Sequence, residues 1–184
     1  PWAPYTPDRV HFNFRWILDY SIGMIADWGA HLFDTAQWGL DVERSGPVEI
    51  DGRGEFLAKG LYNTARTFQV EYRYASGVRM IAENDVPYIR FEGDRGWVGN
   101  RGWRAPLQAE PASILEEVIG PGETRLFTCP AGEHRNFLDC MKTRRDPYFP
   151  AEIGHRVSSV CHLGHISMRL GRKLRWNPET EEFV

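Results

Sequence analysis

Three ionisable residues, Asp27, His31 and Asp34, lie at four- and three-residue steps in the stretch "DYSIGMIADWGAHLFDTAQWGL". On a helix, side chains three or four residues apart share a face, so both carboxylates can reach the imidazole of His31. A carboxylate against one ring nitrogen fixes the tautomer and leaves the other nitrogen free to take a proton. Because histidine titrates near neutral pH, this trio predicts a general acid/base.

Small and aromatic residues beside the trio favour a surface that faces a ligand. Gly23 and Gly29 carry no side chain that would hinder a ligand or another backbone. Trp28 and Trp16 offer flat apolar walls for a sugar or a nicotinamide ring. A purely structural interpretation stays open, because an Asp and a His one helical turn apart commonly form only a local hydrogen bond or ion pair.

Metal binding is a weaker interpretation. The pair Asp27 and His31 supplies two ligands, and no third ligand is identifiable. The three cysteines form no CxxC pair, and "CHLGH" lies in an apolar helical pattern, so a zinc cluster is not predicted. The residues considered for that cluster are Cys129, Cys140, Cys161, His155, His162 and His165. We therefore predict no metal site, and the odd cysteine count favours a reducing, cytoplasmic compartment.

Composition argues against two classes of partner. The 184-residue chain carries 22 basic and 25 acidic residues, and its net charge of −3 gives no electrostatic basis for binding nucleic acid. No run of about 18 apolar residues is present, so no membrane span is predicted. Hydrophobic residues make up 42% of the chain, which is ample material for a core.

The elements that must position the trio follow from the hydrophobic period. Helical spacing predicts a helix from about Ser21 to Gly39 that carries all three residues. From about residue 48 to 103 the period is two, in short runs broken by Gly, Asn and Ser. These runs predict sequential hairpins, with turns at Ala75–Gly77 and at Gly99–Asn100, and hence a mainly antiparallel sheet.

The remaining segments complete the predicted fold. Residues 1–15 show no period and are expected to form an ordered extended segment. Residues 132–147 and 151–171 each predict a helix, and residues 173–184 predict a short strand and a tail. The fold class is therefore one α+β domain over residues 1–184: a mainly antiparallel open sheet with helices packed on one face.

The Gly-rich segment "GDRGWVGNRGW" does not predict a nucleotide loop. A dinucleotide fingerprint places GxGxxG between a strand and a helix, at the start of a βαβ unit. Here the glycines punctuate strands, so the chain carries no Rossmann half of its own.

The stretch "FRWILDYSIGMIADWGAHLFDTAQWGL" resembles the first helix of the C-terminal domain of the Gfo/Idh/MocA oxidoreductase family. The resemblance continues in "SGPVEI", "HRNFLDCMKTRRDP" and "AEIGHRVSSVCHLGHISMRLGRKLRWNP", over nearly the whole chain. It implies a full-length parent in which an N-terminal Rossmann domain holds NAD or NADP. The C-terminal α+β domain would supply contacts to a sugar-like substrate and form a homo-oligomer through its open sheet, whose exposed face we expect to be apolar.

The family's GxGxxG and its catalytic lysine in an E-K-P motif do not occur in this sequence. The resemblance therefore implies that residues 1–20 are the crossover segment that follows a Rossmann domain missing from this chain. Because hydride transfer needs a bound and aimed nicotinamide, the fragment alone is expected to be inactive and to bind no cofactor. The parent would be an NAD(P)-dependent dehydrogenase of a sugar, a sugar derivative or a cyclitol.

The resemblance also implies roles for individual residues. His31 would take the hydroxyl proton as hydride leaves for the nicotinamide, and Asp27 would orient the substrate or the imidazole. Gly23 would lie near the cofactor, whereas Ile22 replaces the first glycine of the family's GGxxxDxxxH pattern and could narrow the approach. The residues expected to contact the substrate are Asp34, Trp28, Arg15 and Trp16.

Two other functions are compatible with the same residues. Some relatives use a transient oxidation at the cofactor to cleave glycosides, so the parent could be a redox-assisted glycoside-cleaving enzyme. Alternatively, the chain could be a carbohydrate-binding or oligomerisation module without catalysis.

Overall fold

The computed structural model describes residues 2–102, 104–123 and 128–184. Contacts divide the chain into two compact units: the first unit is Pro1–Asp85 with His155–Val184, and the second unit is Val86–Gly154. All the predicted site residues lie in the first unit. The assignment of both units to one domain stays a prediction.

The first unit is built on a five-stranded sheet with the order β3-β2-β1-β7-β8, in which every neighbouring pair is antiparallel. The strands are β1 (Glu49–Phe56), β2 (Ala65–Arg73), β3 (Arg79–Glu83), β7 (Leu174–Asn177) and β8 (Glu182–Phe183). The α+β class with a mainly antiparallel open sheet is confirmed.

The predicted turn at Ala75–Gly77 connects β2 to β3. Tyr74 N donates to Val78 O at 3.0 Å, and Gly77 N donates to Tyr74 O at 2.9 Å. Gly77 has a φ of +89°, a backbone conformation that favours glycine, so the sequence signal and the geometry agree.

Four helical segments accompany this sheet: η1 (Asn13–Trp16), α1 (Met24–Asp27), α2 (Gly29–Gly39) and α4 (Ala151–Leu170). The long C-terminal helix α4 is predicted correctly to within a residue or so, including its end before Gly171. The earlier predicted helix ends correctly at Gly39. However, it begins at Met24, later than Ser21, and it is broken at Trp28 into α1 and α2.

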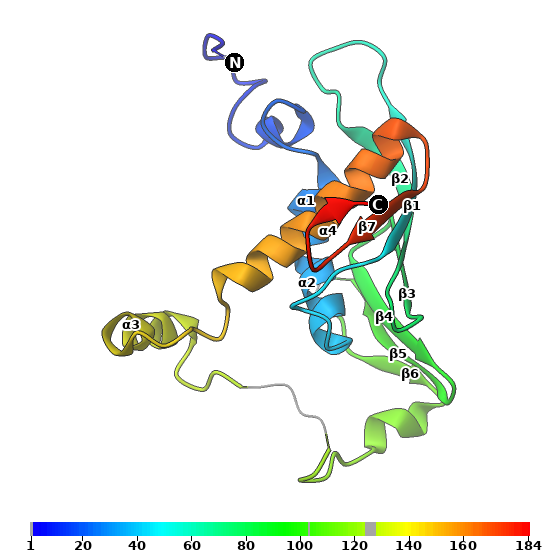
Figure 1. Ribbon diagram of the computed structural model, residues 1–184, viewed down its shortest axis with the longest axis vertical. Helices are drawn as coiled ribbons and strands as arrows, with labels where there is room; N and C mark the ends of the chain where they lie inside the picture. The colour runs from blue at the N-terminus through cyan, green and yellow to red at the C-terminus, as the bar shows by residue number, and fades with distance from the viewer. Residues whose placement is uncertain (1, 103, 124–127) are drawn as a thin grey trace. The chain divides into compact units, whose positions relative to one another are not determined.

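Helices α2 and α4 lie on the same face of the sheet (Figure 1). Tyr72 of β2 is fully buried between them: its hydroxyl donates to Val160 O of α4 at 3.2 Å, and its ring meets Phe33 of α2 edge-on at 5.5 Å. Gly164 of α4 leaves room for that hydroxyl, since a Cβ there would overlap it. Burial of each large apolar side chain contributes about 1.5–3 kcal/mol to stability.

The opposite face of the sheet is mainly polar, with Ile81 of β3 as an exposed apolar residue opposite Glu71, so the expectation of an exposed apolar face is wrong. Strand alternation turns Ile50 and the glycines of β1 toward the helices and leaves the charged residues outside. Glu71 on this face pairs with Arg73 at 2.7 Å and with Arg79 at 3.4 Å. The outward residues of β1 and β2 are Glu49, Asp51, Arg53, Glu55, Thr67, Gln69, Glu71 and Arg73.

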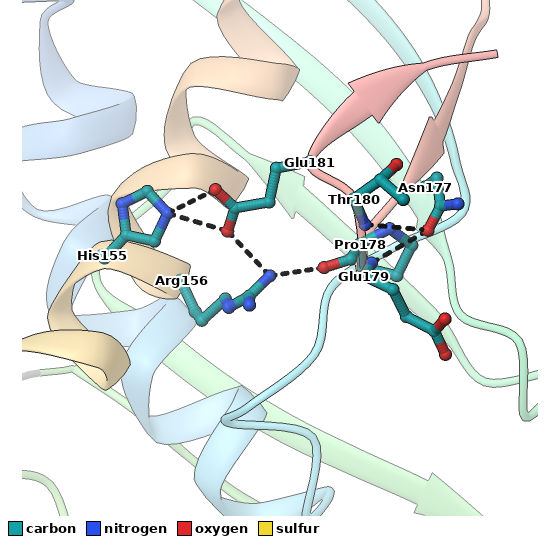
Figure 2. A network of polar contacts seen from close by, with 7 residues as sticks. All are labelled: His155, Arg156, Asn177, Pro178, Glu179, Thr180 and Glu181. Atoms are coloured by element: carbon teal, nitrogen blue, oxygen red, sulfur yellow. Dashed lines mark hydrogen bonds and ion pairs between the residues drawn. The ribbon is translucent and has the colours of Figure 1, made fainter.

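The C-terminus forms a hairpin of β7 and β8, where one strand and a tail were predicted. Asn177 Oδ1 accepts hydrogen bonds from Glu179 N at 2.9 Å and Thr180 N at 3.3 Å, which closes the turn. Figure 2 shows how this turn is fixed to α4. Glu181 contacts His155 Nε2 at 2.8 Å and Arg156 Nη1 at 2.8 Å.

The N-terminal segment was expected to be extended, but it contains turns and η1. Arg9 N donates to Thr6 O at 3.0 Å, and Asn13 N donates to Val10 O at 3.1 Å. These turns are formed by backbone hydrogen bonds. The segment has no hydrophobic period, so its sequence carries no signal for them.

The second unit holds a three-stranded antiparallel sheet with the order β4-β5-β6. Its elements are β4 (Tyr88–Gly93), β5 (Gly96–Arg101), β6 (Gln108–Glu110), η2 (Ala112–Glu116) and α3 (Glu133–Thr143). Helix α3 matches the prediction, whereas β6 lies in a Pro- and Gly-rich segment for which no strand was predicted.

The predicted turn at Gly99–Asn100 is wrong, because β5 runs straight through both residues. The hairpin turns instead between Gly93 and Gly96, which face each other across β4 and β5. Gly99 is required for a different reason: a Cβ there would overlap Ile89 O of the neighbouring strand. A glycine pattern alone does not distinguish a turn from a close approach of two strands.

Candidate active site

A left-handed glycine begins the segment that carries the predicted catalytic residues. Gly23 has a φ of +82° and precedes α1. A Cβ built on it would lie only 2.8 Å from Cβ of Thr64, so both the backbone conformation and the packing require glycine. The preceding Ile22, which stands where the family pattern has its first glycine, is 8% exposed and packs into the interior of the unit. The role of Gly23 near a cofactor stays a prediction.

The break at Trp28 separates Asp27, the last residue of α1, from His31 in the first turn of α2. Trp28 keeps helical dihedral angles, with φ −82° and ψ −32°. The amide of His31 donates to Trp28 O at 3.2 Å, three residues back. The hydrogen bond of His31 therefore spans three residues instead of the four of an α-helix, at the point between the two candidate catalytic side chains.

His31 presents its imidazole at an exposed position of α2. The ring of Trp28 meets it edge-on, with 6.1 Å between ring centroids and 66° between planes. Thr35 Oγ1 donates to the carbonyl of His31 at 2.8 Å. An imidazole that is exposed and flanked by an indole can exchange a proton with a bound molecule, which a sealed histidine cannot do.

Asp27 is paired with Arg15, a partner that the spacing argument did not find. Arg15 Nη1 donates to Asp27 Oδ2, and the two side chains are only 15% and 26% exposed. The predicted role of Asp27 in orienting the substrate or the imidazole stays a prediction. The ion pair shows that its carboxylate has a fixed cationic partner from outside the helix.

Asp34 lies on α2 within electrostatic range of His31. Partial burial raises the pKa of Asp34, and the charge of His31 opposes that rise. Burial also raises the pKa of Glu43, and the charges of Asp34 and Asp41 act in the same direction. A carboxylate of this kind is sensitive to the charge of the neighbouring imidazole.

The loop that precedes β2 is bonded to the backbone that follows Arg15, and the sequence did not predict this contact. Asn63 N and Thr64 N donate to Trp16 O at 2.9 and 3.3 Å. The side chain of Asn63 also accepts a hydrogen bond from Leu18 N at 2.7 Å. The signal in the sequence was the polar pair in "YNTA" before a strand, a composition that favours side-chain hydrogen bonds to backbone.

Metal and membrane sites receive no support from the geometry. Within residues 2–102, 104–123 and 128–184, no three His, Cys, Asp or Glu side chains are placed to hold a metal ion. Cys161 is buried, and burial raises the pKa of its thiol to about 12. Among the helices of these ranges, none is both long and apolar enough to cross a membrane.

Comparison with known protein families identifies the family to which the chain belongs. A family model described as the C-terminal alpha/beta domain of an oxidoreductase family, in the Gfo/Idh/MocA group, matches residues 1–184. The chain belongs to the Gfo/Idh/MocA oxidoreductase family. A comparison with curated proteins gave no match.

Solved structures show the same fold as this Gfo/Idh/MocA domain at low identity. An NAD-binding protein from Listeria innocua is 17% identical with a TM-score of 0.63, over 90% of this chain and 51% of that one. An aldose-aldose oxidoreductase from Caulobacter crescentus, solved with glycerol, is 15% identical with a TM-score of 0.63, over 88% and 50%. The WlbA dehydrogenase from Bordetella pertussis, solved with NADH and UDP-GlcNAcA, is 14% identical with a TM-score of 0.61, over 88% and 47%. The chain spans about half the length of these proteins.

Proposed function

We propose that this chain is the substrate-binding half of an NAD(P)-dependent dehydrogenase that acts on a sugar, a sugar derivative or a cyclitol. The observation that carries the proposal is an exposed His31 between Trp28 and the ionisable Asp34, on the helix that follows the Gly23 turn. Membership of the Gfo/Idh/MocA family and the NADH-bound dehydrogenase among the similar structures support the choice of a redox reaction.

In this proposal the chain binds the substrate and accepts its hydroxyl proton. Oxidation of an alcohol removes a hydride from carbon and a proton from oxygen, and the carbon–oxygen bond becomes a carbonyl. An imidazole nitrogen of His31 accepts the hydroxyl proton, and in the reverse direction it returns that proton. Asp34 stabilises the imidazolium formed, while Trp28 and Trp16 present apolar faces to the C–H side of a sugar ring.

The residues described here do not fit a dinucleotide by themselves. Every strand pairing in the described ranges is antiparallel, whereas a dinucleotide loop opens a parallel βαβ unit. The space beside Gly23 is filled by Thr64 of the same chain. We therefore place NAD or NADP in a Rossmann domain in the other half of the full-length protein. When bound there, the nicotinamide supplies the hydride acceptor.

The assembly is also a proposal. We propose that a homo-oligomer forms through the outer face of the five-stranded sheet, the face opposite helices α2 and α4. Its charged residues alternate in sign along β1, as Asp51, Arg53 and Glu55, so two copies can place opposite charges against each other.

The test replaces the imidazole in the full-length protein. With NAD or NADP and a panel of D-glucose, D-xylose and myo-inositol, H31A should lower the rate of cofactor reduction about 10²- to 10⁴-fold. The matched control is H134A, because the His134 side chain on α3 is 96% exposed. Turnover by H31A at the wild-type rate would refute the assignment. With methyl β-D-glucoside as an additional substrate, release of free glucose without net cofactor reduction would indicate glycoside cleavage, and no chemistry on any of these substrates would indicate a binding module.

A further inference from the structure

The Arg15–Asp27 ion pair is held from outside the candidate catalytic helix, by Arg15, for which only substrate contact was expected, and by Asn63, for which no role in the reaction was expected. We propose that Arg15 and Asn63 are positioning residues: Asn63 holds the turn that carries Arg15, and Arg15 fixes the carboxylate of Asp27, which lies four residues before His31. This inference rests on the proposed function for the meaning of Asp27. It gives Arg15 a role other than direct contact with the substrate.

The guanidinium of Arg15 is held at three points. Its Nε donates to Phe12 O at 2.9 Å, its Cζ lies 3.7 Å from the centroid of the Phe12 ring, and its Nη1 donates to Asp27. The side chain is 15% exposed, and its charge is balanced by the carboxylate. A guanidinium with this set of contacts is oriented before any ligand arrives, so it can hold the Asp27 carboxylate in one orientation.

The turn that carries Arg15 is in turn held by one short loop. Asn63 contributes its backbone N–H to Trp16 O at 2.9 Å and its side-chain oxygen to Leu18 N at 2.7 Å. Thr64 adds a second amide to Trp16 O at 3.3 Å. The hydrogen bonds enclose the residues directly after Arg15, so loss of the Asn63 side chain frees the backbone from which the guanidinium extends.

The same loop also touches the other partner of the ion pair. Thr64 packs against Gly23, where even a methyl group would approach it to 2.8 Å, and Gly23 begins the helix that ends at Asp27. The loop at Asn63 and Thr64 therefore contacts both the start of α1 and the backbone next to Arg15. The distance between the guanidinium and the carboxylate is fixed by this shared support.

A second arginine in the first unit provides a matched comparison. Arg156 also bridges a carboxylate and a backbone carbonyl, with Nη1 2.8 Å from Glu181 and 2.5 Å from Pro178 O, and it is also 15% exposed (Figure 2). Asn84 matches Asn63, because its Oδ1 accepts a hydrogen bond from the amide of Phe68. Arg156 contacts the C-terminal turn and Asn84 contacts β2, both in parts of the first unit away from the Asn63 loop, so both report the structural cost of the same kind of loss.

The first experiment measures turnover of the full-length protein with NAD and the panel of D-glucose, D-xylose and myo-inositol. Because a displacement of about 1 Å at a reacting group can cost about 100-fold, R15Q and N63A are expected to lower kcat about 10- to 100-fold with KM little changed. N63D keeps an acceptor for Leu18 N and is expected to restore kcat. R156Q and N84A are expected to stay within about twofold of wild type.

The decisive variant is the double substitution. If Asn63 acts through Arg15, N63A causes no further loss of kcat in the R15Q background. Effects that multiply in the double variant would overturn the proposal, as would a loss of kcat in R156Q or N84A as large as that in R15Q.

The second experiment needs no substrate, so it separates this proposal from the proposed function. The Nε–H of Arg15 should give a slowly exchanging signal in ¹⁵N NMR spectra of the full-length protein, since it is bonded to Phe12 O. We expect N63A to raise its exchange rate at least tenfold, while N63D and R156Q leave it unchanged. If none of the panel is turned over, the proposed function fails, and this rate alone decides whether Asn63 positions Arg15. An unchanged rate in N63A would refute it.

Discussion

The burial of His165 predicts that the free energy of unfolding falls as the pH is lowered. His165 lies in α4 and is 8% exposed, and its buried Nδ1 has no hydrogen-bond partner among the residues that the structure describes. Phe56 meets its ring edge-on at 6.0 Å. Burial, aided by the positive charges of Arg169 and His162, lowers the pKa of His165 to about 4 from 6.5. The folded protein therefore keeps this ring neutral where the unfolded chain would already protonate it.

The sign and size of the effect follow from linkage. Above pH 6.5 the ring is neutral in both states, so its full contribution to stability is present there. As the pH falls toward 4, the unfolded state binds a proton that the folded state does not bind, and stability is lost. One pKa unit corresponds to about 1.36 kcal/mol, so the loss reaches about 2 kcal/mol at pH 5 and about 3 kcal/mol below pH 4.

Urea denaturation of the 184-residue chain at pH 7 and pH 5 tests this value. In H165F a phenyl ring replaces the imidazole against Phe56 and cannot be protonated, so the loss between the two pH values should shrink by about 2 kcal/mol. H165Q serves the same purpose if the phenyl ring is not accommodated. H134Q removes an exposed histidine and should leave the loss unchanged. If H165F and wild type lose the same free energy on acidification, His165 is not the group responsible, and the argument from its burial fails.

Three further predictions concern the core, the cofactor and the assembly. S167A should lower the free energy of unfolding by about 1–3 kcal/mol, because the buried Ser167 Oγ accepts from Gly52 N at 2.8 Å and donates to Arg172 O at 2.9 Å. A change below about 0.5 kcal/mol in urea titrations would contradict this. The isolated chain should show no NAD binding by calorimetry, and tight binding would remove the need for a separate Rossmann domain. Light scattering should find an oligomer that dissociates at high salt, since the outer sheet face is charged; a monomer at low salt would count against it.

The helical period and the strand alternation were sufficient to predict most elements of this fold. Helix α4 was predicted along its whole length because its apolar side faces a continuous sheet. The break at Trp28 was not predictable from the period, because Trp28 keeps helical dihedral angles while the amide of His31 bonds three residues back. Gly99 was misinterpreted because its need for glycine comes from Ile89 on the neighbouring strand.

For the candidate site, spacing along one helix proposed His31, Asp27 and Asp34 but did not indicate the partner of Asp27. Arg15 lies 12 residues from Asp27, beyond any helical periodicity, and the contact depends on the turn between them. Asn63 is more distant still, 45 residues from its partner Leu18. Pairings of this kind depend on the tertiary fold, and a single sequence carries no local pattern for them.

The supports from outside the helix are a physical requirement of this arrangement. Helix α1 has only four residues, and neither α1 nor α2 has a side-chain hydrogen bond at its N-cap. Isolated helices shorter than about 12–15 residues are marginal in water, so tertiary contacts must keep these two formed. Ile25 and Phe33, at 1% and 4% exposure, anchor one side in the core. In the proposed function the other side leaves the imidazole of His31 open to a ligand, so it cannot be buried in the same way. Polar contacts at its edge can hold it without covering that ring.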